Sequence, residues 1–280
     1  MNEPTLHPRL AHPDDYAHFV RLAHELGTGD PVSPVEPWTA EMMPTTLVFE
    51  DGDVVVGYAF VQPLARMGYV RHVVLAPTHR GRGLGLQIMM AAAGFLRARG
   101  CADWCLNVRP ENTPAVRLYQ GCGLLPRHTS QSIRIPWAIM DTLPREERRV
   151  AAQPIEAADD SGVEATFSLP EGQLANARAR AGRLLLGLRT LDAPQAWTAL
   201  AGFDPRFPGA FLFRAQHLSL AAPLLDAIRP HALPEHTHLR VMVEADEPLA
   251  SLLLAHGGEI KHVTLHMTGP LHLVAAGSSQ

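Results

Sequence analysis

The stretch that decides the fold is Arg80-Gly81-Arg82-Gly83-Leu84-Gly85. It follows a β-rich run, Tyr69–Leu75, and apolar residues then recur at helical spacing as far as Gly100. A helix that begins directly after a glycine-rich turn offers unpaired N–H groups and the positive end of its dipole to an anion. Each N–H bond to a charged oxygen contributes about 1.5–3 kcal/mol. The stretch therefore indicates a phosphate cradle, while a tight turn between strand and helix explains the loop alone equally well.

Two other phosphate-binding loops do not fit this stretch. A P-loop requires lysine and then serine or threonine after its last glycine, whereas Leu86 and Gln87 stand here. The dinucleotide-binding fingerprint requires glycine or alanine three residues after its second glycine. That position holds Ile88 or Leu86, depending on which glycine is taken as the first. Both kinds of nucleotide loop are therefore excluded.

A second segment lies downstream, Asn112-x-x-Ala115-x-x-Leu118-Tyr119-x-x-x-Gly123-Leu124. Together with the strand, the loop and the helix before it, this segment makes Val73–Leu124 similar to the GNAT superfamily of N-acetyltransferases. Either segment alone is common, but both in this order and at this spacing are specific. The resemblance implies a GNAT-like acyltransferase fold, with acetyl-CoA as the acyl donor.

The resemblance also implies roles for individual residues. The third strand of the fold diverges from its neighbour, so backbone groups at Val73 and Leu75 would bind the pantetheine arm of the cofactor, and an N–H there would polarise the thioester carbonyl. Asn112 would hydrogen-bond the same arm. Tyr119 would be the catalytic general acid for the departing thiolate, the alternative being a half-buried structural tyrosine. The cofactor-binding residues expected in this way are Val73, Val74, Leu75, Arg80, Gly81, Arg82, Gly83, Leu84, Gly85 and Asn112.

The sequence does not identify the general base. In many relatives it lies on the third strand, at positions that Tyr69 and Arg71 hold here. His72 has a suitable reference pKa, but period-two alternation places it on the face opposite Arg71, so a structural histidine is favoured. Glu36 and Glu41 lie in the proline-rich segment that covers the acceptor pocket in the family, and a solvated surface carboxylate is favoured for each. A water relay to a distant carboxylate stays open.

The order of the expected elements indicates a mixed α/β sheet. Apolar residues between Tyr16 and Leu26 predict a helix that stops at Gly27. Thr113 and Pro114 resemble the N-cap and the first residue of another helix. The expected strands are 46–50, 54–63, 69–75, 102–108 and 132–139, a hairpin turn is expected at 51–53, and residues 30–44 are expected to form a loop with a short helix.

Residues 141–160 mark the expected boundary between two domains, because this stretch is charged, contains proline and is poor in large apolar residues. We therefore expect a catalytic GNAT-like domain over residues 1–145 and a second GNAT-like domain over residues 146–280. Leu239–Val243 corresponds to the strand around Asn107 after a shift of 134 residues, which indicates an internal duplication.

The second half lacks the chemistry of the first. Arg214-Ala215-Gln216-His217 stands in place of the glycine loop, Leu253 at the tyrosine position and Asp246 at the asparagine position. A helix start without glycines and with an acidic residue should not hold pyrophosphate. One cofactor site per chain is therefore expected, and the second domain is expected to be a packing partner, a dimer surface or a wall of the acceptor pocket.

Composition restricts the class of protein and its partners. The formal net charge is −4, with 46% hydrophobic and 19% charged residues, so the chain is globular and has no concentrated basic face for nucleic acid. No apolar run approaches about 18 residues and no signal peptide is evident, which favours a cytoplasmic protein without membrane contact.

Cys101, Cys105 and Cys122 lack disulfide or zinc spacing. His236 and His238 resemble a metal pair, but no further ligand accompanies them, and no metal is expected.

These observations predict an acetyl-CoA-dependent N-acetyltransferase, in which a primary amine attacks the acetyl group directly. The acceptor, a small molecule or a peptide amine, is not identified by the sequence, and a homodimer is compatible with it. The alternative from another class is a non-catalytic acyl-CoA sensor or interaction protein. Tyr119 argues against this alternative, because a sensor needs no leaving-group acid. A nucleotide-binding enzyme is the third alternative, and it requires that ATP or NAD outcompete CoA.

Overall fold

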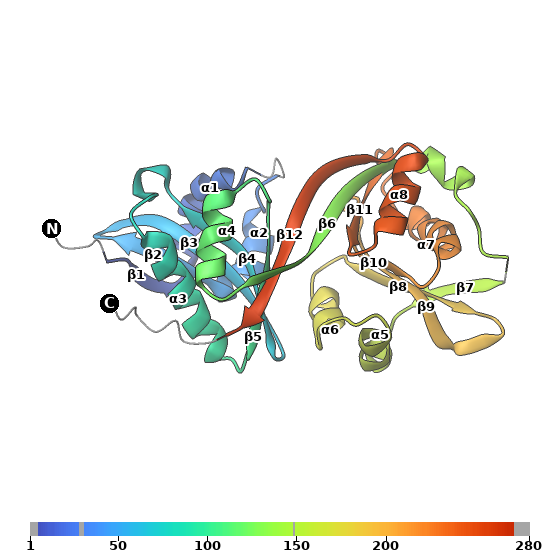
Figure 1. The fold of residues 1–280 in the computed structure, drawn as a ribbon, viewed down its shortest axis with the longest axis horizontal. Coiled ribbons are helices and arrows are strands. Elements are labelled where there is room, and N and C mark those ends of the chain that lie inside the picture. Colours follow the sequence, from blue (N-terminus) through green and yellow to red (C-terminus); the bar gives the residue numbers. More distant parts are fainter. Residues whose placement is uncertain (1–4, 28–30, 148, 272–280) are drawn as a thin grey trace. The chain divides into compact units, whose positions relative to one another are not determined.

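A computed structural model of the protein describes residues 5–27, 31–147 and 149–271. Asp30, the first residue of the expected proline-rich loop, lies outside these ranges. The chain forms two compact units: unit 1 contains residues 1–127 and 266–280, and unit 2 contains residues 128–265. In each unit, helices pack on strands of a mixed β-sheet (Figure 1).

The sheet of unit 1 has the strand order β1-β2-β3-β4-β5-β12. The bounds are β1 His7–Leu10, β2 Thr46–Asp51, β3 Val54–Leu64, β4 Met67–Leu75, β5 Asp103–Val108 and β12 Glu259–Pro270. Strands β1 to β4 pair antiparallel, whereas β4 and β5 are parallel. The expected hairpin turn joins β2 to β3, and Gly52 in this turn has a φ of +62°, which favours glycine.

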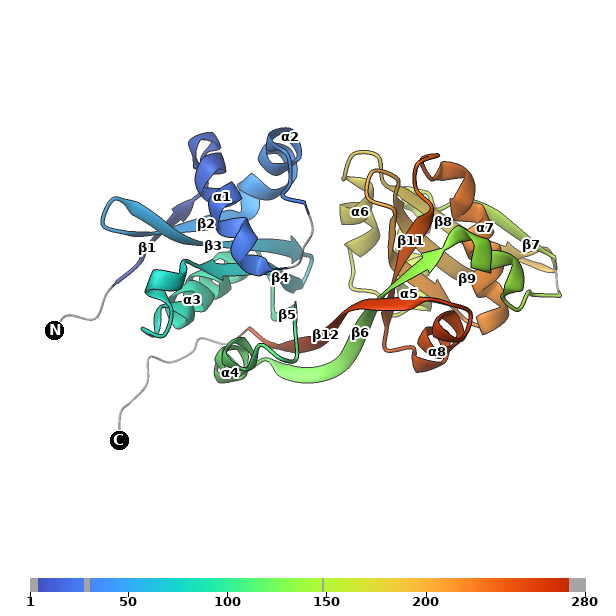
Figure 2. The same cartoon turned by 90° about the horizontal axis from the view of Figure 1, so that it is seen from above.

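Helices cover both faces of the sheet in unit 1. Their bounds are α1 Tyr16–Ala23, α2 Val35–Pro37, α3 Leu84–Arg97 and α4 Thr113–Gly121. Helices α1 and α2 lie on one face, and α3 and α4 on the other (Figure 2). Side chains of β3 alternate between the faces: Tyr58 packs with Phe19 of α1, whereas Ala59 packs with Ile88 of α3. The strand is apolar on both faces because both are covered.

The last strand of the chain returns to unit 1. Thr268 Oγ1 donates to the Trp104 carbonyl oxygen at 3.0 Å, and the Leu271 N–H donates to the Ala102 carbonyl oxygen at 2.8 Å. These bonds satisfy backbone groups along β5 that would otherwise face an open edge. The boundary expected after residue 145 thus differs from the division of the compact units, which falls after residue 127 and again before His266.

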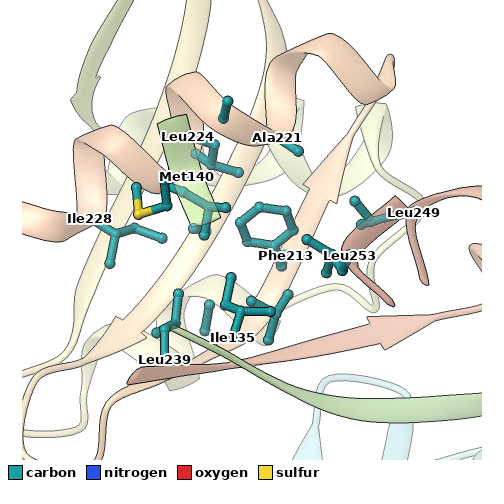
Figure 3. Close-up of a cluster of buried hydrophobic side chains, with 14 of the residues drawn as sticks. Ile135, Met140, Phe213, Ala221, Leu224, Ile228, Leu239, Leu249 and Leu253 are labelled. Atoms are coloured by element: carbon teal, nitrogen blue, oxygen red, sulfur yellow. The ribbon is translucent and has the colours of Figure 1, made fainter. Parts of the chain in front are cut away.

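Unit 2 repeats the arrangement with a different core. Its strand order is β7-β8-β9-β10-β11-β6-β12. The further bounds are β6 Leu125–Pro136, β7 Val150–Pro154, β8 Leu184–Thr190, β9 Ala193–Asp204, β10 Gly209–Ala215, β11 His238–Glu244, α5 Asp160–Thr166, α6 Gln173–Arg178, α7 Ala221–Ile228 and α8 Glu247–Ala255. Phe213 of β10 packs among Leu224 of α7 and Leu253 of α8 in an apolar core (Figure 3). Leu253 holds the position of Tyr119 after the shift of 134 residues and is fully buried there.

Two expected element boundaries were wrong. The N-cap of α4 is Asn112 rather than Thr113, because the Asn112 side-chain oxygen accepts the Ala115 N–H at 3.3 Å. The strand expected over 132–139 is β6, which begins at Leu125 and ends at Pro136, and a 3-10 helix follows over Trp137–Thr142. Proline cannot donate a ladder hydrogen bond, which suits the end of a strand.

Strand β4 contains a β-bulge that the sequence analysis did not predict. Phe60 and Val61 are consecutive on β3, but their partners on β4 are His72 and Val70. Arg71 is therefore the extra residue of the bulge, and the strict alternation used to place His72 and Arg71 on opposite faces is broken at this point. No glycine or proline marks the bulge in the sequence.

Candidate active site

The glycine-rich loop leads into α3. Gly81 and Gly83 have φ angles of +75° and +76°, which L-residues rarely adopt, and Gly83 is the N-cap of the helix. A Cβ atom at Gly85 would lie 2.9 Å from Leu118 Cδ2, so glycine lets α3 and α4 approach each other. The amide N–H groups of residues 81–85 make no hydrogen bond within the described part of the chain. These groups are available to bind an anion.

A pocket of about 550 Å³ lies beside this loop. The expected site residues that line it are Val73, Val74, Leu75, Arg80, Gly81, Gly85, Asn112 and Tyr119. Arg82, Gly83 and Leu84 do not line it. Arg82 is exposed, Gly83 makes the turn, and Leu84 is fully buried in the core beneath α3. The pocket thus joins the loop, the end of β4 and helix α4, which come from three separate parts of the sequence.

Strands β4 and β5 diverge beside the pocket. Their pairing ends at Val70 and Leu106, although both strands continue. Ala76 donates its N–H to the Val56 carbonyl oxygen on β3 at 2.7 Å. Because backbone groups of a strand alternate between its two edges, the N–H and C=O groups of Val73 and Leu75 face the opening toward β5. This is the geometry that an amide-bearing ligand arm requires to bind a strand edge.

Tyr119 projects from α4 into this pocket. Its side chain is buried, with an exposed fraction of 8%. Burial raises the pKa of Tyr119 to about 12, and the neighbouring Cys122 thiol acts in the same direction. Within the described residues the Tyr119 hydroxyl makes no hydrogen bond, so it can donate to a group in the pocket.

The Asn112 side chain both caps α4 and lines the pocket. Its side-chain oxygen is the capping atom. With the oxygen engaged by the helix, the amide nitrogen is the part of Asn112 that can donate to a ligand carbonyl. The cap thereby orients the donor.

Arg80 lines the pocket and forms an ion pair that the sequence did not predict. Its guanidinium donates to the Leu75 carbonyl oxygen at 3.0 Å and to Glu25 Oε2 at 2.7 Å. Glu25 also lines the pocket, and it comes from the turn after α1, 55 residues earlier in the chain. The pair is partly exposed, so its contribution to stability is small, but it fixes the direction of the guanidinium beside the loop. No local pattern near Glu25 could have indicated this contact.

None of the residues considered as a general base lines this pocket. His72 lies on β4 against Tyr58 and Phe60, and its Nδ1 atom is 3.2 Å from the Tyr58 hydroxyl. Desolvation, with a smaller contribution from Arg71, lowers the pKa of His72 to about 4. This environment is that of a structural histidine, as the sequence favoured. Glu36 is exposed on α2, and Glu41 lies in the helical turn Trp38–Met42 that follows.

The comparisons with known proteins concern residues 16–124 and the fold of the chain. Residues 16–124 match the model of the acetyltransferase (GNAT) family. Over this segment the chain is similar to the GNAT acetyltransferase family. Streptothricin acetyltransferase from Streptomyces lavendulae is 32% identical over 107 residues, which are 38% of this chain and 56% of that protein. Glucosamine 6-phosphate N-acetyltransferase 1 from Oryza sativa subsp. japonica is 32% identical over 82 residues, which are 29% of this chain and 48% of that protein. The chain thus spans about half the length of these relatives.

Solved structures of GNAT proteins resemble the whole chain in fold. A GCN5-related N-acetyltransferase from Sphaerobacter thermophilus has a TM-score of 0.66 at 16% identity and covers 98% of both chains. A tandem GNAT protein from the clavulanic acid biosynthesis pathway has a TM-score of 0.62 at 16% identity and covers 99% of both chains. The expected fold, a mixed α/β sheet in two GNAT-like domains, is confirmed.

Other expectations concern metals and membranes. Within residues 5–27, 31–147 and 149–271, no group of three or more His, Cys, Asp or Glu side chains could hold a metal ion. His236 precedes strand β11, which begins at His238, so the two do not share a face of one strand. Among the described helices, none is long and apolar enough to cross a membrane.

Proposed function

We propose that unit 1 transfers an acetyl group from acetyl-CoA to a primary amine. The observation that carries this proposal is the shared pocket of about 550 Å³, which contains the loop before α3, the open edge of β4 and the Tyr119 side chain. The loop suits the pyrophosphate of the donor, the open edge of β4 suits its amide-bearing arm, and Tyr119 suits its thioester. The relatives named above are named as acetyltransferases, one of them as an N-acetyltransferase, which supports the same class of reaction.

The residues present fit acetyl-CoA. The unpaired N–H groups of residues 81–85 and the dipole of α3 would bind the pyrophosphate. Val73 and Leu75 would bind the pantetheine arm through their backbone groups, and Asn112 through its side-chain amide. Once bound, acetyl-CoA supplies an acetyl group activated as a thioester.

Tyr119 would act on the leaving sulfur as a hydrogen-bond donor. Its pKa of about 12 keeps the hydroxyl protonated throughout the physiological range. A thiol has a pKa of about 8.5, so complete proton transfer from Tyr119 to a thiolate would be uphill by about 5 kcal/mol. Donation to the developing negative charge on sulfur costs no such transfer and lowers the barrier. The general-acid role implied by the family resemblance thus becomes, in this proposal, hydrogen-bond donation.

We also propose that unit 2 has no cofactor site. Its β10 and β11 pair at Gly209 and Ala210 and then diverge, as β4 and β5 do. Here an ion pair between Arg214 and Glu244 crosses between the two strands. No glycine lies between Gly209 and the start of α7 at Ala221. Unit 2 would therefore serve structure or acceptor binding instead.

The test is thiol release from acetyl-CoA by the full-length protein in the presence of a panel of primary amines, with a reaction lacking amine as the control. Amine-dependent release, together with the acetylated amine in the mass spectrum, is the expected result. CoA binding without release by any amine would favour the acyl-CoA sensor. Absence of CoA binding would overturn the assignment of the pocket.

A further inference from the structure

A chain of polar side chains crosses three strands of unit 1 where β4 and β5 diverge. Asn107 Nδ2 donates to the Tyr69 hydroxyl oxygen at 2.5 Å, and Asn107 Oδ1 lies 3.0 Å from His266 Nδ1. The three residues come from β5, β4 and β12 respectively. Asn107 immediately follows Leu106, the last residue of β5 that pairs with β4.

The hydrogen bonds determine the tautomer of His266. Because Asn107 donates through Nδ2 to Tyr69, the atom that it presents to His266 is Oδ1, which can only accept. His266 Nδ1 therefore carries the hydrogen, and the lone pair of the neutral ring is on Nε2. Orientation of an imidazole by a hydrogen bond to one nitrogen is the arrangement by which a neighbouring group makes the other nitrogen an effective base.

The polar chain lies on the α1 face of the sheet, opposite helix α4, which carries Tyr119. Gln62 and Phe60 share a face of β3, and Phe60 packs with the α1 side of the sheet. Tyr69 is the register partner of Gln62, so its side chain lies on the same face. Tyr119 instead comes from α4, on the other face (Figure 2). For an acetyl group held in the opening between β4 and β5, the CoA sulfur would thus lie toward the α4 face of the sheet. An incoming amine would approach from the α1 face.

Two further contacts hold Tyr69 in position. The Arg71 guanidinium stacks over the Tyr69 ring at 3.6 Å from its centroid, and Arg71 Nε donates to Gln62 Oε1 at 2.8 Å. Gln62 is itself buried, with an exposed fraction of 5%. A rigid Tyr69 in turn fixes Asn107, which is what a precise hydrogen-bond relay requires.

Unit 2 lacks this arrangement. The residue that corresponds to Asn107 after the shift of 134 residues is Val241, which is fully buried in the apolar core. The polar chain is therefore a feature of the unit that also has the cofactor pocket, and the duplication alone does not account for it.

We propose that His266 is the general base of the acetyl transfer and that Asn107 is the residue that positions it. This inference rests on the proposed function of unit 1. The amine nitrogen forms a bond to the acetyl carbon, and His266 Nε2 takes the proton that the nitrogen loses and passes it to solvent. The carbon–sulfur bond breaks, and its electron pair leaves on the sulfur, which is hydrogen-bonded to Tyr119 and takes a proton from water. The site would thus accept a primary amine from the α1 side of the sheet.

The decisive variant is His266→Asn. The asparagine amide can still donate to Asn107 Oδ1 from the place of Nδ1, but it has no atom at the place of Nε2. We expect kcat/KM for the amine to fall about 100-fold or more, with unchanged affinity for CoA. His7→Gln, at an exposed histidine of the edge strand β1, is the matched control and should leave the rate unchanged.

The pH profile separates a catalytic role from a structural one. The titratable or charged groups in the polar chain around His266 are Tyr69 and, stacked on it, Arg71. Between about pH 5 and 8, where histidine titrates, the acidic limb of kcat/KM should be lost in His266→Asn. Asn107→Asp should move the same limb to higher pH, because a carboxylate beside Nδ1–H favours the protonated ring.

The outcomes distinguish this inference from the proposed function. If the wild-type protein acetylates no amine, the proposed function fails. If the wild type is active and His266→Asn keeps its rate within threefold with its acidic limb intact, His266 is not the base. Should His266→Asn fail to fold, Asn107→Asp decides: a displaced limb supports the role of His266, and an unmoved limb overturns it.

Discussion

Asn112 and Asp246 cap equivalent helices in the two units. The Asn112 side-chain oxygen accepts the Ala115 N–H at 3.3 Å, and Asp246 Oδ1 accepts the Leu249 N–H at 3.0 Å. The helices that follow, Thr113–Gly121 and Glu247–Ala255, are displaced by the same 134 residues. Both helices thus have a side-chain cap at the same position. The cap is neutral in unit 1, where it is asparagine, and anionic in unit 2, where it is aspartate.

This change of charge predicts one CoA site per chain. The pocket at the start of α8 is lined by Asp246 and Glu247, whose carboxylates repel an anionic cofactor and offer no N–H donor to its amide-bearing arm. Isothermal titration of the full-length protein with CoA should therefore give a stoichiometry of one. Gly83→Val should remove all of the binding heat, with no residual weaker site. A second site that survives this substitution would show that unit 2 also binds the cofactor.

Gly83 and Gly52 provide a matched pair for testing the loop. Both have positive φ, +76° and +62°, and a Cβ at either position would meet no atom within 4 Å. Valine should therefore strain the backbone similarly at both positions, by about 1–3 kcal/mol. Gly83→Val should also turn the N–H groups of the loop away from the pocket and weaken CoA binding 100-fold or more, whereas Gly52→Val should lower only the melting temperature. Equal CoA affinity in the two variants would refute the loop assignment.

Tyr119→Phe should separate catalysis from binding. Removing the hydroxyl leaves the ring packing intact and takes away the donor to the leaving sulfur, so kcat should fall about 10²–10³-fold while CoA affinity stays within a factor of two. Tyr16→Phe removes a hydroxyl that bonds the Ser33 carbonyl oxygen instead, and it should leave kcat unchanged. Steady-state thiol release and CoA titration of both variants are the measurements. Unchanged turnover in Tyr119→Phe would remove Tyr119 from the mechanism.

The parts of the site that could be predicted from sequence are those encoded locally. Gly81, Gly83 and Gly85 had to lie together because they are neighbours in one turn before one helix. Tyr119 followed because its spacing of seven residues from Asn112 places both on one face of α4, with Asn112 at the N-cap and Tyr119 toward the C-terminal end. In each case a few consecutive residues determine the geometry.

The parts that could not be predicted depend on distant contacts. His266 and Asn107 are 159 residues apart, and neither has a local pattern that indicates a pair. The return of β12 to unit 1 depends on the open edge of β5, which is a property of the sheet rather than of any segment. The bulge at Arg71 has no glycine or proline to mark it. A protein truncated after residue 145 would keep the loop and Tyr119 and lose His266.

The environment of His72 predicts that the protein becomes less stable as the pH falls. Its pKa is lowered from 6.5 to about 4, chiefly by desolvation, so between these values the unfolded chain binds a proton that the folded chain does not. Stability from this group is therefore fully present above about pH 6.5 and is lost as the pH falls toward 4. The loss should reach about 2–3 kcal/mol over this window.

His72→Gln tests this expectation, because glutamine offers Tyr58 a hydrogen-bond partner and does not titrate. We expect the urea midpoint of the wild type to fall more steeply from pH 7.5 to pH 5 than that of His72→Gln, and the two curves to converge in slope above pH 7. Trp38 packs against Phe19 and Tyr58 in the same core. Fluorescence of a background that keeps Trp38 as its only tryptophan (Trp104→Phe, Trp137→Phe and Trp197→Phe) therefore reports on this region. Parallel pH dependence in the two proteins would mean that His72 is protonated as readily in the folded state as in the unfolded chain.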